Sequence, residues 1–135
     1  MSDRLDNEQW IKEKYDEICA SHLGEYCLVS MKIKRFRVFN RLFGREAGNQ
    51  LIERVHQRVQ DYLKEDEYIA HIHLGYFNML MKLPRDYDGL FHKIIDFNAF
   101  VRDMPGNEDT GKVYMGLGVY KIDDPTIDFL SLIHI

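Results

Sequence analysis

The stretch that decides the fold is residues 28–55, LVSMKIKRFRVFNRLFGREAGNQLIERV. It begins as a strand with one apolar face, because side chains alternate along a strand and Ser30, Lys32 and Lys34 all fall on the opposite face. It continues as a short helix that Gly44 ends, and then as a long helix with apolar residues at three- and four-residue spacing. The stretch therefore predicts a strand that is followed by a short helix and then by a long helix.

Cations gather where this strand passes into the short helix, at Lys32, Lys34, Arg35, Arg37, Arg41 and Arg45. No acid lies between Glu25 and Glu46, although the whole chain has a formal net charge of −4. Any affinity for nucleic acid or membranes would therefore be local to these cations. Three interpretations stay open: a solvated surface, a phosphate-binding site, or a docking surface for an acidic partner. Nucleic acid is the least expected partner, because the interleaved phenylalanines have the helical spacing of core residues.

The composition is typical of a single-domain globular protein. The chain of 135 residues is long enough for one domain with a core, and 45% hydrophobic with 30% charged residues fits a soluble protein. No apolar run is long enough to span a membrane, and the polar residues after Met1 do not form a signal peptide. We therefore expect a cytoplasmic protein in which Cys19 and Cys27 stay reduced.

The remaining segments predict an α+β domain with a mostly antiparallel sheet flanked by helices. Residues 8–21 and 86–104 are predicted helices, and 25–33 and 112–122 are predicted strands. Residues 67–84 predict two strands around a turn at Leu74–Gly75, where glycine supplies the positive φ angle. The inward positions of the helix at 86–104 are predicted to be Leu90, Phe91, Ile94, Ile95 and Val101. A last helix starts at Asp124–Pro125 and is short, so we expect a truncated C-terminal end or a native continuation.

Residues 28–55 resemble the opening of a GGDEF domain, the domain of the diguanylate cyclase family. The matching positions, at matching spacing, are Phe36, Asn40, Phe43, Gly44, Ala47 and Gly48. The segment AHIHLGYFNMLMKLP, residues 70–84, resembles the R-x-G-G-D-E-F hairpin that names the family. The resemblance covers residues 26–135, leaves residues 1–25 as an N-terminal helix and linker, and implies a nucleotide-cyclase-like fold.

The same resemblance implies that the family's metal-binding acids are missing. In the family, two acids hold divalent metal ions against the GTP triphosphate, and Lys32 and Gly75 stand at their positions. Lys34 replaces a further aspartate, and the hairpin motif reads His73, Leu74, Gly75, Tyr76 and Phe77, of which only Phe77 is kept. An ammonium about 4 Å from a unit charge contributes roughly 4 kcal/mol at an effective dielectric near 20, and toward a metal ion this energy is repulsive. We therefore expect no magnesium site, no other metal site and no catalytic residue.

Some nucleotide-binding positions are carried over by the resemblance. Asn40 falls on the family's guanine-recognising asparagine, and Asn49 replaces an aspartate that binds the same base. The candidate nucleotide-binding residues are Asn40, Asn49, Phe36, Lys32, Lys34 and Arg35. The family's inhibitory R-x-x-D motif maps onto Lys64 and Glu67, where lysine lacks arginine's planar fork, so weak or absent binding of cyclic-di-GMP is expected there.

The resemblance with these replacements implies a catalytically inactive, GGDEF-like regulatory module of cyclic-di-GMP signalling. Its expected partners are GTP and a linked EAL phosphodiesterase domain, whose activity it would modulate. Two alternatives stay open: a ligand-free structural domain for dimerisation or docking, and a residual diguanylate cyclase that uses displaced acids such as Asp66 or Glu67. The helix at residues 8–21 either packs on its own sheet or contributes to a homodimer.

Overall fold

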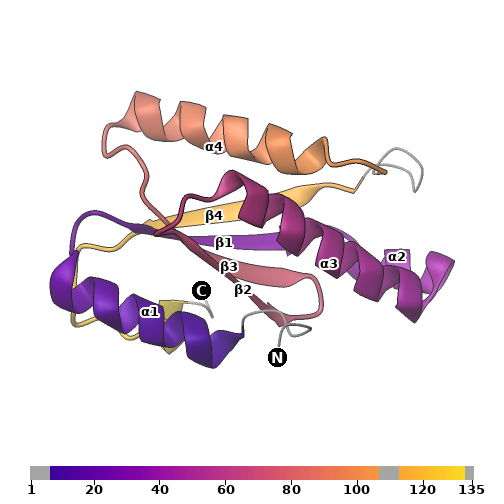
Figure 1. Ribbon diagram of the computed structural model, residues 1–135, viewed down its shortest axis with the longest axis horizontal. Coiled ribbons are helices and arrows are strands. Elements are labelled where there is room, and N and C mark those ends of the chain that lie inside the picture. The colour runs from indigo at the N-terminus through magenta and orange to yellow at the C-terminus, as the bar shows by residue number, and fades with distance from the viewer. Residues whose placement is uncertain (1–6, 107–112, 133–135) are drawn as a thin grey trace.

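A sheet of four antiparallel strands in the order β2-β3-β1-β4 organises residues 7–106 and 113–132, the part of the chain that the computed structural model describes (Figure 1). The elements are α1 Glu8–Ser21, β1 Cys27–Ile33, α2 Phe36–Phe43, α3 Arg45–Tyr62, β2 Tyr68–His73, β3 Tyr76–Met81, α4 Tyr87–Arg102, β4 Met115–Lys121 and α5 Phe129–Leu132. This order and the antiparallel pairing confirm the predicted α+β class. No helix in the described ranges is long and apolar enough to cross a bilayer.

Strand alternation divides the core into two clusters, one on each face of the sheet. Val29, Met31 and Ile33 of β1 lie with the buried side chains of α3 and α4, while Leu28 lies with those of α1 and α5. Figure 1 shows α3 and α4 on one side of the sheet and α1 on the other. Because Lys32 and Ser30 point to the α1 side, the polar face predicted for β1 is confirmed.

The helix α1 packs on its own sheet, one of the two arrangements expected for it. Asn7 caps its N-terminus, since the side chain accepts a hydrogen bond from the Trp10 backbone N–H at 3.1 Å. Ile11, Tyr15 and Ile18 are buried, and the Tyr15 hydroxyl donates to the Ile127 carbonyl at 2.8 Å. These contacts connect the first helix to the segment that follows β4. Both cysteines are free thiols, as expected.

The predicted inward face of α4 is wrong at two positions. Phe91 and Ile95 are each 51% exposed, whereas Phe97 and Val101 are fully buried. Apolar residues occupy more of this helix than one stripe, and the sheet can cover only one. The stripe that it covers contains Leu90, Ile94, Phe97 and Val101, at the helical spacing of four, three and four.

Two smaller expectations are also corrected. The last helix begins at Phe129 and not at Asp124–Pro125. The Asp124 carboxylate accepts hydrogen bonds from the N–H and the hydroxyl of Thr126, at 2.9 and 2.6 Å, and these bonds form a turn in place of a first helical turn. Phe43, expected in the core, is 49% exposed at the C-terminus of α2, although its ring lies 4.9 Å from that of the buried Phe39.

Candidate functional site

The last residues of β1 and the β2–β3 hairpin form one edge of the candidate site. Lys32 pairs with Tyr76 on β3 and with Gly116 on β4, and Ser30 pairs with Asn78. At the tip of the hairpin, the backbone N–H of Ile33 donates to the Gly75 carbonyl at 2.8 Å. The turn is therefore attached to the end of β1, immediately before α2 begins.

The positive φ angle of the hairpin lies at Leu74 and not at the predicted glycine. Leu74 has φ 49°, and its carbonyl oxygen lies 2.5 Å from His71 Nε2, which donates to it as the N–H tautomer. Gly75 provides space instead, because a Cβ added there would lie 3.1 Å from side-chain carbons of both Ile33 and Phe36. A carboxylate at position 75 would thus require the side chains of Ile33 and Phe36 to shift by a few tenths of an ångström.

A basic cleft of about 530 Å³ opens between this hairpin and the start of α2. Its cations are Lys32, Arg35 and Arg37, and among the described residues that line it the only carboxylate is Glu8 of α1. Three positive charges and one negative charge give a net charge of +2 with histidine neutral. We call this hollow the basic cleft. An excess of positive charge on this scale favours an anionic ligand.

Aromatic side chains lie beside the cations of the basic cleft. The Lys32 ammonium lies 6.0 Å from the centre of the Tyr76 ring, and the His73 ring stacks on Tyr76 at 5.1 Å with planes 17° apart. The neighbouring His71 is more buried than His73, and this burial lowers the pKa of the His71 imidazole below 6.5. The hydrogen bond to the Leu74 carbonyl opposes the shift, and the charge of His73 adds to it. His71 therefore supports the turn as a neutral side chain near pH 7.

The backbone at the start of α2 is strained at Arg35. This residue has φ 59° and ψ 33° at the N-cap of α2, and its side chain makes no capping hydrogen bond. Residues other than glycine rarely adopt this left-handed backbone conformation, because it costs them about 1–2 kcal/mol. Such strain is often found at functional sites. The strained residue supplies one of the three cations of the basic cleft.

The candidate nucleotide residues are only partly brought together. Lys32, Arg35 and Phe36 line the basic cleft, whereas Lys34 turns toward a second hollow beside α2. Asn40 and Asn49 line neither, so the base-reading role expected of them stays a prediction.

Asn40 packs against the next helix. A Cβ added at Gly48 would lie 1.7 Å from Asn40 Oδ1, and this oxygen is buried without a hydrogen-bond partner in the described structure. A side chain at position 48 would therefore displace the Asn40 side chain from its observed position. Asn49 is exposed on α3.

The two positions at which the resemblance implies magnesium-binding acids supply no side-chain oxygen ligand. Mg²⁺ prefers several oxygen ligands in octahedral geometry, usually with one or two carboxylates. Positions 32 and 75 carry an ammonium and a glycine, which supply none. In residues 7–106 and 113–132, no three His, Cys, Asp or Glu side chains are close enough together to hold a metal ion.

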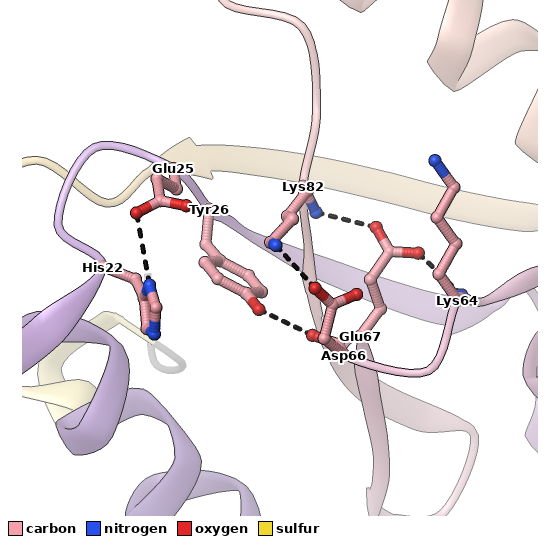
Figure 2. A network of polar contacts seen from close by, with 7 residues as sticks. All are labelled: His22, Glu25, Tyr26, Lys64, Asp66, Glu67 and Lys82. Atoms are coloured by element: carbon pink, nitrogen blue, oxygen red, sulfur yellow. Dashed lines mark hydrogen bonds and ion pairs between the residues drawn. The ribbon is translucent and has the colours of Figure 1, made fainter.

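Of the two residues of the expected inhibitory motif, Glu67 has a structural role, and the backbone N–H of Lys64 is one of its two donors. Figure 2 shows Glu67 between two segments of backbone: its carboxylate accepts from the N–H of Lys64 at 2.9 Å and from the N–H of Lys82 at 2.8 Å. Glu67 is only 8% exposed, so both of its oxygens hold the chain together. Asp66 beside it pairs with the Lys82 ammonium at 2.5 Å, and its carbonyl accepts from the Tyr26 hydroxyl at 2.7 Å. Neither acid is placed at the basic cleft.

The comparisons with known proteins identify the family. The family model described as "Diguanylate cyclase, GGDEF domain" matches residues 3–133, nearly the whole chain. The chain belongs to the GGDEF domain family. No curated protein matches its sequence.

Solved GGDEF structures share this fold. The coiled coil and GGDEF domain of DgcB from Caulobacter crescentus, in complex with c-di-GMP, matches with a TM-score of 0.70 and 21% identity, over 85% of this chain and 64% of that chain. LapD from Vibrio cholerae, an S helix-GGDEF-EAL structure bound to c-di-GMP, matches with a TM-score of 0.73 and 20% identity, over 96% of this chain and 30% of that chain. This chain therefore spans less than two thirds of either protein. Both matches have the fold of the GGDEF family to which this chain belongs.

Sequence reasoning missed several residues of the basic cleft. Glu8 reaches it from α1, and Ser30 and Asn78 form its floor on the α1 side of the sheet. The sequence carried a signal for Asn78, because it is a polar residue in an otherwise apolar strand. In the structure it is only 4% exposed. The position of Glu8 carried none, because it depends on how α1 packs against the hairpin strands.

Proposed function

We propose that this GGDEF domain is a catalytically inactive regulatory domain that binds a nucleoside triphosphate, GTP by family resemblance, through its phosphates and without magnesium. The observation that carries the proposal is the charge of the basic cleft, where three cations face one carboxylate. A triphosphate bound there would have its charge offset by Lys32, Arg35 and Arg37. In this arrangement, side-chain cations take the place of the metal ions that the family resemblance implies for an active cyclase.

Inactivity follows from the same residues. Cyclisation in this family requires metal ions that bridge the triphosphate and the attacking hydroxyl, as the resemblance implies, and these ions need carboxylate ligands. Lys32 repels a divalent ion, and Gly75 is packed so closely against Ile33 and Phe36 that no side chain fits without a shift. The cleft can therefore hold phosphates, but positions 32 and 75 carry no carboxylate that could hold the metal ions of an active cyclase.

The regulatory part of the proposal rests on domain architecture. LapD joins a GGDEF domain to an EAL domain in one chain, and this chain matches only 30% of that protein. A domain that binds nucleotide without turning it over can regulate its neighbour through a coupling free energy between two sites. We infer that this domain acts on a linked EAL phosphodiesterase domain in this way.

The experiment is a pair of assays on the purified domain. Isothermal titration with GTP should give saturable binding, and incubation with GTP and Mg²⁺ should give no cyclic-di-GMP. The variant Lys32→Asp removes one exposed ion pair and adds a repulsion, each worth up to about 1 kcal/mol, so the affinity should fall by roughly tenfold to thirtyfold. ATP in place of GTP tests whether the base contributes.

Lys121→Asp is the matched control, because it makes the same charge change at an exposed position at the end of β4, away from the basic cleft. It should leave the affinity within about twofold. Equal losses for both variants would show that GTP responds only to net charge, and formation of cyclic-di-GMP by the unmodified domain would refute its inactivity.

A further inference from the structure

A second surface adjoins the basic cleft along α2, and Arg35 and Val38 line both. Four large apolar side chains are exposed there: Val38 by 47%, Leu42 by 70%, Phe43 by 49% and Tyr114 by 50%. They surround a groove of about 630 Å³ whose floor includes the buried Phe39 and Met115. We call this the α2 groove.

The rim of the α2 groove is positively charged. Lys34 and Arg35 line it, and no acid is among the described residues that do so. On the exposed surface of α2, Arg37 and Arg41 form a row at four-residue spacing directly beside the apolar row of Val38 and Leu42. The helix thus presents one apolar ridge and one cationic ridge, parallel to each other.

We propose that the α2 groove binds an acidic amphipathic helix of a partner protein. A ridge of residues at four-residue spacing packs into the groove between the matching ridges of a second helix, which is the commonest helix-packing geometry. Helix-in-groove recognition uses such anchors at three- and four-residue spacing. The helix that fits here has leucine-like residues along one row and Asp or Glu along the adjacent row, which face Arg37 and Arg41.

A second copy of this chain does not fit the surface. In a symmetric contact the same patch lies on both subunits, so a surface that carries Lys34, Arg37 and Arg41 would meet a second surface of the same positive charge. The exposed apolar area is also small. Exposures of about half to two thirds on side chains of roughly 150–250 Å² give about 400 Å², against about 800 Å² per partner in a stable interface. A single helix needs no larger area for a regulatory, reversible contact.

A titration of the ¹⁵N-labelled domain with synthetic peptides tests the proposal. The probe is a helix-forming peptide of about 18 residues, or five turns, with leucine on one row and glutamate on the next. A second peptide has lysine in place of every glutamate, and a short single-stranded DNA is the third probe. The glutamate peptide should bind and shift the amide signals of α2, and the lysine peptide should not bind.

Variants place the binding at the α2 groove. Leu42→Ser and Arg41→Glu should each weaken the glutamate peptide by about fivefold or more, and both sites are exposed, so the fold is retained. Tyr87→Ser and Arg85→Glu are matched controls at exposed positions away from α2 and should leave the affinity unchanged.

Four results would each overturn the proposal. They are no binding of the glutamate peptide, equal binding of the lysine peptide, tighter binding of DNA through the same amides, and a concentration-dependent dimer of the domain that Leu42→Ser abolishes.

Discussion

Replacing Arg35 by glycine should stabilise the domain. Arg35 has a left-handed backbone with φ 59° and ψ 33°, and its side chain does not cap α2. That conformation costs a residue with a Cβ about 1–2 kcal/mol, and glycine adopts it freely. Glycine also raises the entropy of the unfolded chain, which costs about 0.4–1 kcal/mol. The difference predicts that Arg35→Gly increases the free energy of unfolding by roughly 0.5–1 kcal/mol.

Arg37→Gly is the control within the same helix. Arg37 lies inside α2 with helical backbone geometry, where glycine costs about 1 kcal/mol relative to a good helix former. Both variants remove one cation from the basic cleft, so both should weaken GTP binding to a similar degree. Stability should change in opposite directions, while affinity falls in both.

Urea unfolding followed by circular dichroism measures the effect, and thermal unfolding should show a midpoint about 2–5 °C higher for Arg35→Gly. If Arg35→Gly lowers the free energy of unfolding as Arg37→Gly does, then the left-handed geometry is not a source of strain and the reasoning is refuted.

Three further predictions concern the hairpin and the buried acid. Gly75→Asp should lower the free energy of unfolding by about 1–3 kcal/mol, because its Cβ would lie 3.1 Å from carbons of Phe36; an unchanged urea midpoint would contradict this. The pKa of His71 is lower in the folded chain than in the unfolded chain, so the unfolded chain binds the proton more readily. The contribution of His71 to the free energy of unfolding should therefore be full above pH 6.5 and fall as the pH drops below it. His71→Gln should remove this part of the slope when the free energy of unfolding is measured against pH. Glu67→Ala should lower the free energy of unfolding by about 2–4 kcal/mol, since two buried backbone N–H groups lose their acceptor at about 1–3 kcal/mol each. The exposed control Glu65→Ala should change the free energy of unfolding by less than about 0.5 kcal/mol. Equal effects of the two variants would show that the buried carboxylate is not structural.

The order of elements and the polar face of β1 could be predicted from the sequence, because both depend on local periodicity. Ser30 and Lys32 alternate with buried residues whatever the rest of the chain does. Gly44 ends α2 with φ 93°, a conformation that local sequence preferences anticipate.

The features that could not be predicted depend on contacts between distant segments. Turn preferences assign the positive φ to Gly75, but α2 packs so close to the turn that glycine is used for space and Leu74 takes the left-handed angle. Nothing local shows that Glu67 is buried, because one of its two donors is the backbone N–H of Lys82, on the far side of the hairpin. The exposed face of α4 was ambiguous because the helix carries more apolar residues than its sheet can cover.

The resemblance located the charge replacement, and the structure shows where those charges go. Lys32 and Arg35 line one hollow, while Lys34 and Arg35 line another. A single basic run in the sequence is thus shared between two surfaces with different neighbours, one polar and aromatic and the other largely apolar. This division is the basis for assigning a nucleotide to the first and a protein helix to the second.

The most direct test of the account is the affinity of the domain for GTP with and without divalent metal. Magnesium neutralises part of the triphosphate charge, so a cleft that binds phosphates through Lys32, Arg35 and Arg37 should bind GTP more tightly in EDTA than in excess Mg²⁺. Binding that appears only when Mg²⁺ is present would contradict the account.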